Sequence, residues 1–403
     1  MPISLFEQVT LAPRDPILGL NEQFAADPRP DKVNLGVGVY FDAQGKLPVL
    51  ECVAEAERQL VGAGKPKGYL PIDGIAAYDK AVQGLVFGDG SAVLREGRVA
   101  TVQALGGTGG LKLGADFLKR LSPSAQVLIS DPSWENHRAL FTNAGFEVAS
   151  YPYYDAATRG IRFDALLAAL RAARAGSIVV LHACCHNPTG CDLMPEQWAD
   201  VVEVCQARAL VPYLDMAYQG FGDGIAEDGA VVQRFVEAAV PFLVATSFSK
   251  SFSLYGERVG ALSVVCTSAD EAVRVLSQLK VVIRTNYSNP PTFGAQVVAT
   301  ALTTPALRQL WERELGGMRE RIRAMRQALL AGLRAAGVAA GAGQLDYITR
   351  QKGMFSYSGL SAAQMQRLRT EFGVYGVDSG RICVAALNQG NLPRVVAALA
   401  KVM

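Results

Sequence analysis

Short apolar runs alternate with longer stretches of helical periodicity through the middle of the chain. The runs have the length of β-strands, and the stretches between them, such as Leu111–Leu121 and Phe163–Ala173, repeat apolar positions at helical spacing. This alternation predicts an α/β fold in which helices cover both faces of a mostly parallel sheet. The predicted strands are Arg98–Gln103, Gln126–Ser130, Ser177–His182, Val211–Leu214, Phe242–Thr246 and Gly260–Val265.

The pattern changes towards the C-terminus, and 403 residues exceed what one hydrophobic core usually serves. The stretch Leu310–Ala336 is helical and rich in arginine, and its mixed charges predict a solvated helix face. A second α/β pattern follows, with strands predicted at Met354–Tyr357 and Arg381–Val384. We therefore expect two domains, and the N-terminal segment Val33–Tyr40 fits the smaller one.

Charge and composition narrow the classes of function. The chain has 39 basic and 37 acidic residues, so its net charge of +2 gives no reason to expect nucleic acid or an anionic membrane as partner. No apolar run reaches the length of a bilayer span, and Met1–Gln8 lacks the basic and apolar regions of a signal peptide. Seven cysteines, an odd number, fit free thiols better than a disulfide framework. We expect a cytoplasmic protein.

Polar or glycine-rich clusters directly follow five of the predicted strands. Ligands of open α/β sheets bind at the carboxyl ends of the strands, so five such clusters together are far more specific than any one of them. The clusters are Gly106–Gly110, Asp131–His137, Asn187–Gly190, Asp215 with Tyr218, and Ser247–Arg258.

The most informative cluster places a lysine, Lys250, among serines and close to an arginine. A desolvated lysine near other cations loses its proton more easily and can form an imine with an aldehyde. Ser247, Ser249 and Arg258 are the short donors and the planar cation that a phosphate dianion needs. Together they predict pyridoxal phosphate (PLP), an aldehyde with a phosphate tail. For an isolated motif, a surface lysine on a serine-rich turn is the better interpretation, and the other clusters argue against it.

The other clusters offer groups that suit the rest of PLP. Gly107–Thr108 precedes a predicted helix, where backbone N–H groups approach an anion, although a plain helix cap is an equal alternative. Asp215 ends a buried strand and needs a partner, such as a pyridinium N–H. Tyr218 and Asn187 can donate to a phenolate oxygen, and Trp134 can stack on a ring. A capping Asp, a core Tyr, a turn Asn and a core Trp remain the structural alternatives.

Zinc and serine-hydrolase chemistry have less support. The run His182–His186 contains two histidines and two cysteines, which suggests a metal. If the strand continues, however, Cys184 and Cys185 point to opposite faces, so buried thiols explain them better and no metal is expected. The chain also lacks G-x-S-x-G, G-x-G-x-x-G and P-loop motifs.

Two arginines lie outside the strand-end clusters. Arg381 would be costly inside a domain without an anionic partner, and Arg284 falls on a predicted loop that is aromatic and bounded by prolines. Each can bind a carboxylate through a bidentate fork or form a structural ion pair.

Taken together and in this order, the clusters resemble those of the class I, fold-type I PLP-dependent aminotransferases over nearly the whole chain. The resemblance is greatest to the branch of aspartate and aromatic-amino-acid (tyrosine) aminotransferases. It implies an N-terminal arm over 1–14, a large PLP-binding domain over 48–317, and a small domain formed by 15–47 and 318–403.

The resemblance also implies roles for individual residues. Lys250 would form the imine with PLP and move a proton between substrate and cofactor, and Asp215, supported by His137, would hold the pyridinium nitrogen. Arg381 would bind the substrate α-carboxylate. The other implied residues are Gly38, Trp134 and Asn187 beside the substrate, Trp134 stacked on the ring, Asn187 and Tyr218 at the phenolate, and Gly107, Thr108, Ser247, Ser249 and Arg258 at the phosphate.

A homodimer with shared active sites also follows from the resemblance. Tyr69 would reach the phosphate of the neighbouring subunit, and Arg284 would cross over to bind the distal carboxylate of aspartate, glutamate or 2-oxoglutarate. Phe41 and Leu47 stand where aspartate specialists carry Lys and Thr, so burial should favour an aromatic ring. Gly68 replaces a larger residue and would loosen the pocket rim.

We therefore expect an aminotransferase that moves the amino group of tyrosine, phenylalanine or aspartate to 2-oxoglutarate by a ping-pong mechanism. The alternative is an aspartate aminotransferase with weak aromatic activity. A non-catalytic regulator on this fold would carry an added DNA-binding domain, for which the sequence has no segment. Decarboxylation or β-elimination would need another orientation of the α-carbon bonds.

Overall fold

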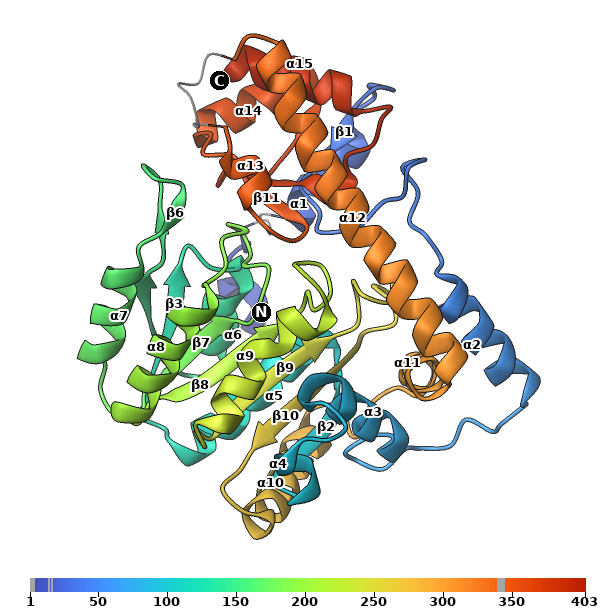
Figure 1. Cartoon of the computed structure of the whole chain (residues 1–403), viewed down its shortest axis with the longest axis vertical. Coiled ribbons are helices and arrows are strands. Elements are labelled where there is room, and N and C mark those ends of the chain that lie inside the picture. The colour runs from blue at the N-terminus through green and yellow to red at the C-terminus, as the bar shows by residue number, and fades with distance from the viewer. Residues whose placement is uncertain (1–3, 14, 16, 339–344) are drawn as a thin grey trace.

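The computed structural model describes residues 4–13, 15, 17–338 and 345–403, and a seven-stranded sheet forms the centre of its larger part (Figure 1). The strands are β2 Val99–Leu105, β3 Gln126–Asp131, β4 Glu147–Pro152, β7 Ile178–His182, β8 Val211–Met216, β9 Phe242–Ser247 and β10 Val259–Val265. Their order is β2-β10-β9-β8-β7-β3-β4. The neighbours from β9 to β4 pair in parallel, and β10 is antiparallel to both β2 and β9. The mostly parallel α/β sheet is confirmed.

Every predicted strand of this sheet exists, with small shifts at its ends. β8 continues past Leu214 to Met216, so Asp215 lies within the strand and not after it. The sequence pattern missed β4, an edge strand whose residues are mostly exposed or half-buried. An edge strand of this kind lacks the continuous apolar run that marks the central strands.

The sheet is buried on both faces because alternate residues of each strand enter different cores. In β7, Ile178 and Val180 pack on one side, and Val179 and Leu181 pack on the other. This period of two is the geometry of a pleated strand, and double burial explains why the strand is apolar throughout. Helices α5, α6 and α10 cover the first face, and α3, α7, α8, α9 and α11 contribute to the second core.

The helix bounds are α1 Leu18–Ala26, α2 Glu51–Gly62, α3 Ala76–Phe87, α4 Ala92–Arg95, α5 Gly106–Leu121, α6 Glu135–Asn143, α7 Phe163–Ala172, α8 Pro195–Ala207, α9 Ile225–Glu237, α10 Ala269–Asn286, α11 Phe293–Thr303, α12 Pro305–Ala335, α13 Tyr347–Arg350, α14 Ala362–Phe372 and α15 Leu392–Val402.

The long helix α12 runs from α2 and α11 beside the large sheet to α13 and α15 in the C-terminal part (Figure 1). Its buried stripe includes Leu307, Trp311 and Leu315, at the spacing of one helix face. The expectation that its charges are all solvated is wrong at one position. Arg326 is 3% exposed, and its guanidinium donates to the carbonyls of Ile348, Gly353 and Phe355.

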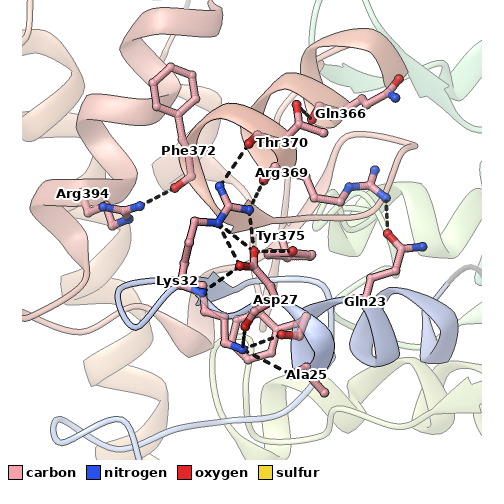
Figure 2. A network of polar contacts seen from close by, with 12 residues as sticks. Gln23, Ala25, Asp27, Lys32, Gln366, Arg369, Thr370, Phe372, Tyr375 and Arg394 are labelled. Atoms are coloured by element: carbon pink, nitrogen blue, oxygen red, sulfur yellow. Dashed lines mark hydrogen bonds and ion pairs between the residues drawn. The ribbon is translucent and has the colours of Figure 1, made fainter.

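Residues before the large sheet join the C-terminal part. Strand β1 (Val33–Asn34) pairs in parallel with β12 (Val374–Tyr375), and β11 (Phe355–Tyr357) pairs with β13 (Arg381–Cys383). Figure 2 shows the polar network that ties the same segments together, where the Asp27 carboxylate accepts from Arg29 and from the Tyr375 hydroxyl at 2.6 Å. These contacts agree with a small domain built from 15–47 and 318–403, and the division stays a prediction.

The remaining elements are short. They are the hairpin β5 (Tyr154–Asp155) and β6 (Gly160–Ile161), and the 3-10 helices η1 (Leu5–Gln8) and η2 (Val384–Ala386). Of the predicted arm 1–14, residues 1–3 and 14 lie outside the described residues, and Leu5, Phe6 and Leu11 are exposed. Among the described helices, none combines the length and the apolar character needed to cross a bilayer.

Candidate active site

A cavity of about 240 Å³ lies at the carboxyl ends of the parallel strands, where the sequence clusters predicted a ligand. It brings together residues from all five clusters, and only the cluster of Asp215 and Tyr218 lines it completely. The predicted residues in its lining are Gly38, Gly107, Thr108, Trp134, Asn187, Asp215, Tyr218, Ser247, Ser249, Lys250 and Arg258.

Lys250 lies just beyond β9, and its ammonium nitrogen is 4.8 Å from the centre of the Tyr218 ring. Burial lowers the pKa of Lys250 to about 8, and the positive charges of Arg258 and Arg381 act in the same direction against the opposing charge of Asp215. About a tenth of the amine is therefore uncharged at pH 7, against well under a hundredth at the ordinary pKa, and the uncharged form is the one that attacks an aldehyde.

Asp215 lies on β8, the strand next to β9, and its carboxylate has an imidazole partner. His137 Nε2 is 3.0 Å from Asp215 Oδ2. Burial alone would raise the pKa of Asp215, but the hydrogen bond of His137 and nearby positive charge, including that of Lys250, together outweigh it and lower that pKa below its ordinary value. Asp215 is therefore a carboxylate with one side held by His137, and it faces a cavity that also contains Lys250.

Further polar groups continue behind His137, and the sequence analysis did not assign them this place in the site. Ser133 Oγ lies 2.9 Å from His137 Nδ1 and 3.5 Å from His182 Nε2, and the rings of His182 and His186 are 4.2 Å apart. Burial lowers the pKa of His182 to about 3 and holds that of His186 well below its ordinary value, so both are neutral at pH 7. The chain has three histidines, and all three lie behind this site. The placing of every histidine of the chain close to two of the strand ends is the sequence signal that could have identified these groups.

At the other end of the cavity, glycines allow a close approach between a helix N-terminus and an arginine. Helix α5 begins at Gly106, directly after β2, and not near Leu111 as predicted. Gly106 has φ +70°, and a Cβ there would lie 2.5 Å from Arg258 Nη2. A Cβ on Gly107 would lie 3.0 Å from that of Ser247, and Arg258 Nη1 donates to Ser249 Oγ at 3.3 Å. The backbone N–H groups, hydroxyls and guanidinium that converge here suit a phosphate.

Arg381 lies behind the cavity wall and is 1% exposed. Its guanidinium donates to Asn187 Oδ1 at 3.0 Å and to the Gly36 carbonyl at 2.9 Å, and it stacks on the Phe355 ring at 4.3 Å. Its Nε is buried and has no acceptor among the described residues. A buried cation with a free donor beside the cavity can bind a carboxylate.

Two predicted residues are not brought to the cavity by this chain. Tyr69 is 96% exposed. Arg284 was expected on a loop, which is wrong, because α10 continues to Asn286 and places Arg284 in its last turn. The Arg284 side chain is exposed and donates to the Ser288 hydroxyl.

The cavity also includes residues that the sequence analysis did not single out. Ile17, Tyr255 and Phe355 line it, and only Tyr255, inside the lysine segment, carried a sequence signal. The Tyr255 hydroxyl accepts the Tyr40 N–H at 2.9 Å, which ties the N-terminal segment to the site. Ile17 and Phe355 come from segments distant in sequence, so only the fold reveals them.

A continued strand would have pointed Cys184 and Cys185 to opposite faces, but the strand does not extend that far. β7 ends at His182, and the two sulfurs lie within 4.8 Å of each other and of an Asp228 carboxylate oxygen. That carboxylate already accepts three backbone N–H bonds, which occupy three of its about four lone-pair positions. The interpretation as buried free thiols agrees with the structure.

Comparison with known proteins gives concordant matches over essentially the full length. Residues 30–399 match the family described as aminotransferase class I and II. The chain is 60% identical to an aspartate aminotransferase of Pseudomonas aeruginosa (100% of both chains) and 54% identical to an aromatic-amino-acid aminotransferase of Escherichia coli (99% and 100%). The crystal structure of an aromatic-amino-acid aminotransferase from Burkholderia pseudomallei, covalently bound to pyridoxal phosphate, superposes with a TM-score of 0.96 at 64% identity, covering 99% of this chain and 100% of that one. The chain thus belongs to the class I and II aminotransferases.

Proposed function

We propose that this protein is a PLP-dependent aminotransferase that takes the amino group from tyrosine, phenylalanine or aspartate and passes it to 2-oxoglutarate. The observation that carries this conclusion is the position of Lys250. Its amine has a lowered pKa and shares one cavity with the His137-bound carboxylate of Asp215 and a phosphate-type cradle.

The residues present fit PLP at both of its ends. The cradle of Gly107, Ser249 and Arg258 would hold the phosphate, and Asp215 would hold the ring nitrogen in its protonated state. Bound there, PLP supplies an aldehyde that carries the amino group and a ring that withdraws electrons from the substrate α-carbon.

The chain's own residues then hold the substrate and move its proton. Lys250 Nζ, uncharged in part because its pKa is lowered, would accept the proton of the α-carbon and return it to the cofactor side. Burial raises the pKa of Tyr218 well above its ordinary value, so its hydroxyl stays protonated and can donate a hydrogen bond. Arg381 would fix the α-carboxylate, which orients the α-hydrogen towards Lys250.

Use of both aromatic and acidic donors rests on less direct observations. Phe41 packs half-buried against the core and Leu47 is exposed, and neither is among the described residues that line the cavity. Relatives with more than half of their residues identical carry both names, aspartate and aromatic-amino-acid aminotransferase. An aspartate aminotransferase with weak aromatic activity is therefore the second candidate.

A homodimer and a cytoplasmic location belong to the same proposal. The exposed positions of Tyr69 and Arg284 support a shared site, because each could complete the cavity of a second copy. All seven cysteines are free, which suits a reducing compartment.

A donor panel with 2-oxoglutarate as acceptor tests the proposal. We expect parallel double-reciprocal plots and a kcat/KM for tyrosine equal to or greater than that for aspartate. A ratio that strongly favours aspartate would select the second candidate, and intersecting plots would contradict the ping-pong mechanism.

A further inference from the structure

Helix α6 places a carboxylate opposite the buried Arg381. Its first residue, Glu135, follows Trp134 of the cavity wall, and Glu135 Oε2 lies 3.8 Å from Arg381 Nη1. Among the residues that the structure describes, Glu135 is the only carboxylate within 4.0 Å of the Arg381 guanidinium. Sequence reasoning had used Glu135 only as part of a motif, so this contact is a finding of the fold.

The two groups face each other without closing a hydrogen bond. A separation of 3.8 Å exceeds hydrogen-bond distance. Glu135 Oε2 is buried and has no hydrogen-bond partner, and Arg381 Nε likewise has none among the described atoms. Unsatisfied buried charges are unfavourable, and structural ion pairs of buried arginines normally close into forks. The open geometry leaves donors of Arg381 available to another anion.

We propose that Glu135 is the resident counter-ion of Arg381 and that it weakens binding of every substrate α-carboxylate. The inference rests on the proposed function, in which Arg381 binds that carboxylate. When a substrate carboxylate approaches Arg381, Glu135 becomes the second negative charge against one guanidinium, and like charges in a partly buried site repel.

This repulsion acts on ground state and transition state alike, because the α-carboxylate stays bound to Arg381 throughout. Uniform binding of that kind changes KM and leaves kcat unchanged. Glu135 is thus a positioning residue that prevents amino acids and oxo acids from binding too tightly to leave. Every substrate carries an α-carboxylate, so the effect is the same for aromatic and acidic substrates.

The test compares Glu135→Gln with the unsubstituted holoenzyme by calorimetric titration of 3-phenylpropionate, which carries one carboxylate and an aromatic ring. We expect the Kd to fall by about threefold to tenfold in the variant, the range of a partly exposed charge pair. The uncharged 3-phenylpropionamide should show no change. In steady-state assays, KM for tyrosine and for aspartate should fall by the same factor, with kcat unchanged.

Two controls separate this effect from a general loss of negative charge or of folding. Glu147→Gln removes an exposed carboxylate whose contact is with Gln126 Nε2 at 2.8 Å, and it should leave every constant unchanged. In an Arg381→Leu background the carboxylate is no longer held beside Glu135, so Glu135→Gln should change the Kd much less than it does with Arg381 present. If Glu135→Gln has a lower melting temperature than the unsubstituted protein, Glu135→Ala removes the same charge without introducing an amide.

An unchanged or higher Kd in a folded Glu135 variant would overturn the inference, as would an equal effect with and without Arg381. Those outcomes leave the proposed function intact. Failure of the unsubstituted holoenzyme to transaminate any amino acid would instead overturn the proposed function, whatever the variants do.

Discussion

The floor of the cavity, formed by Lys250 and Asp215, and its proposed rim, formed by Tyr69 and Arg284, differ in how far one chain completes them. On the floor, Lys250 follows β9 and Asp215 lies on the neighbouring strand β8, the amine has a lowered pKa, and the carboxylate has its imidazole partner in place. At the predicted rim, Tyr69 is 96% exposed and Arg284 is exposed on α10. The difference teaches that the groups proposed to hold the cofactor ring and to react with its aldehyde are in place within one chain, whereas Tyr69 and Arg284, proposed for the phosphate and the distal carboxylate, can act only at a second surface. In our proposal that surface belongs to a second copy.

Removal of the floor amine should have the largest effect. For Lys250→Ala we expect kcat to fall by about 10⁴-fold or more, because both the covalent attachment and the proton transfer are lost. Stopped-flow single-turnover assays measure the chemical step directly. A residual rate within about tenfold of the unsubstituted enzyme would show that the floor is not where the chemistry takes place.

The next largest effect is expected at the carboxylate of the floor. Asp215→Asn keeps the shape but removes the charge that would hold the ring nitrogen protonated, so we expect kcat to fall by about 10²- to 10⁴-fold. The affinity for PLP, followed by absorbance, should fall much less. His137→Asn leaves Asp215 charged but without its imidazole partner and serves as the matched variant. It should lower kcat less than Asp215→Asn does.

A pair of arginine variants distinguishes floor from rim most sharply. Arg381→Leu should lower kcat/KM for tyrosine and aspartate alike by about 10²-fold or more, because it removes a buried cation. Arg284→Leu should lower kcat/KM for aspartate by about 10- to 100-fold, the value of hydrogen bonds to a charged group, and spare tyrosine. Equal damage to both substrates by Arg284→Leu would contradict its assignment to the distal carboxylate.

The pH dependence of PLP attachment reports the environment of the floor. The uncharged amine reacts, and burial has lowered the pKa of Lys250 from 10.5 to about 8. The attachment rate in cofactor-free protein should therefore rise about tenfold per pH unit below pH 8 and level off above it. The rate at which Nα-acetyl-lysine reacts with PLP in solution should continue to rise towards pH 10. A protein profile that follows the free amine would show that the site does not lower the pKa.

The sequence predicted the strands and the chemistry at their ends because both depend on local pattern. Central strands are apolar throughout because they are buried on two faces. Asp215 and Lys250 can be singled out in the sequence because they are charged residues at or just after the ends of those apolar runs. Element boundaries were less accurate. Helix α5 begins at Gly106 because the glycines enter its first turn, and α10 extends through Arg284.

Relations between distant segments could not be predicted from local pattern. Phe355 reaches the cavity, and Glu135 reaches Arg381, only when the C-terminal part packs against the strand ends. Buried arginines are a further case. The sequence distinguishes Arg381 by its cost inside a domain, whereas Arg326 resembles the solvated arginines around it, and only the fold shows which carbonyls surround it.

The most direct measurement is to locate the covalent bond between protein and cofactor. The holoenzyme is reduced with borohydride, digested and analysed by peptide mass spectrometry. The account predicts a phosphopyridoxyl group on the peptide that contains Lys250 and on no other lysine. A label on a different lysine, or a protein that takes up no label in the presence of excess PLP, would contradict it.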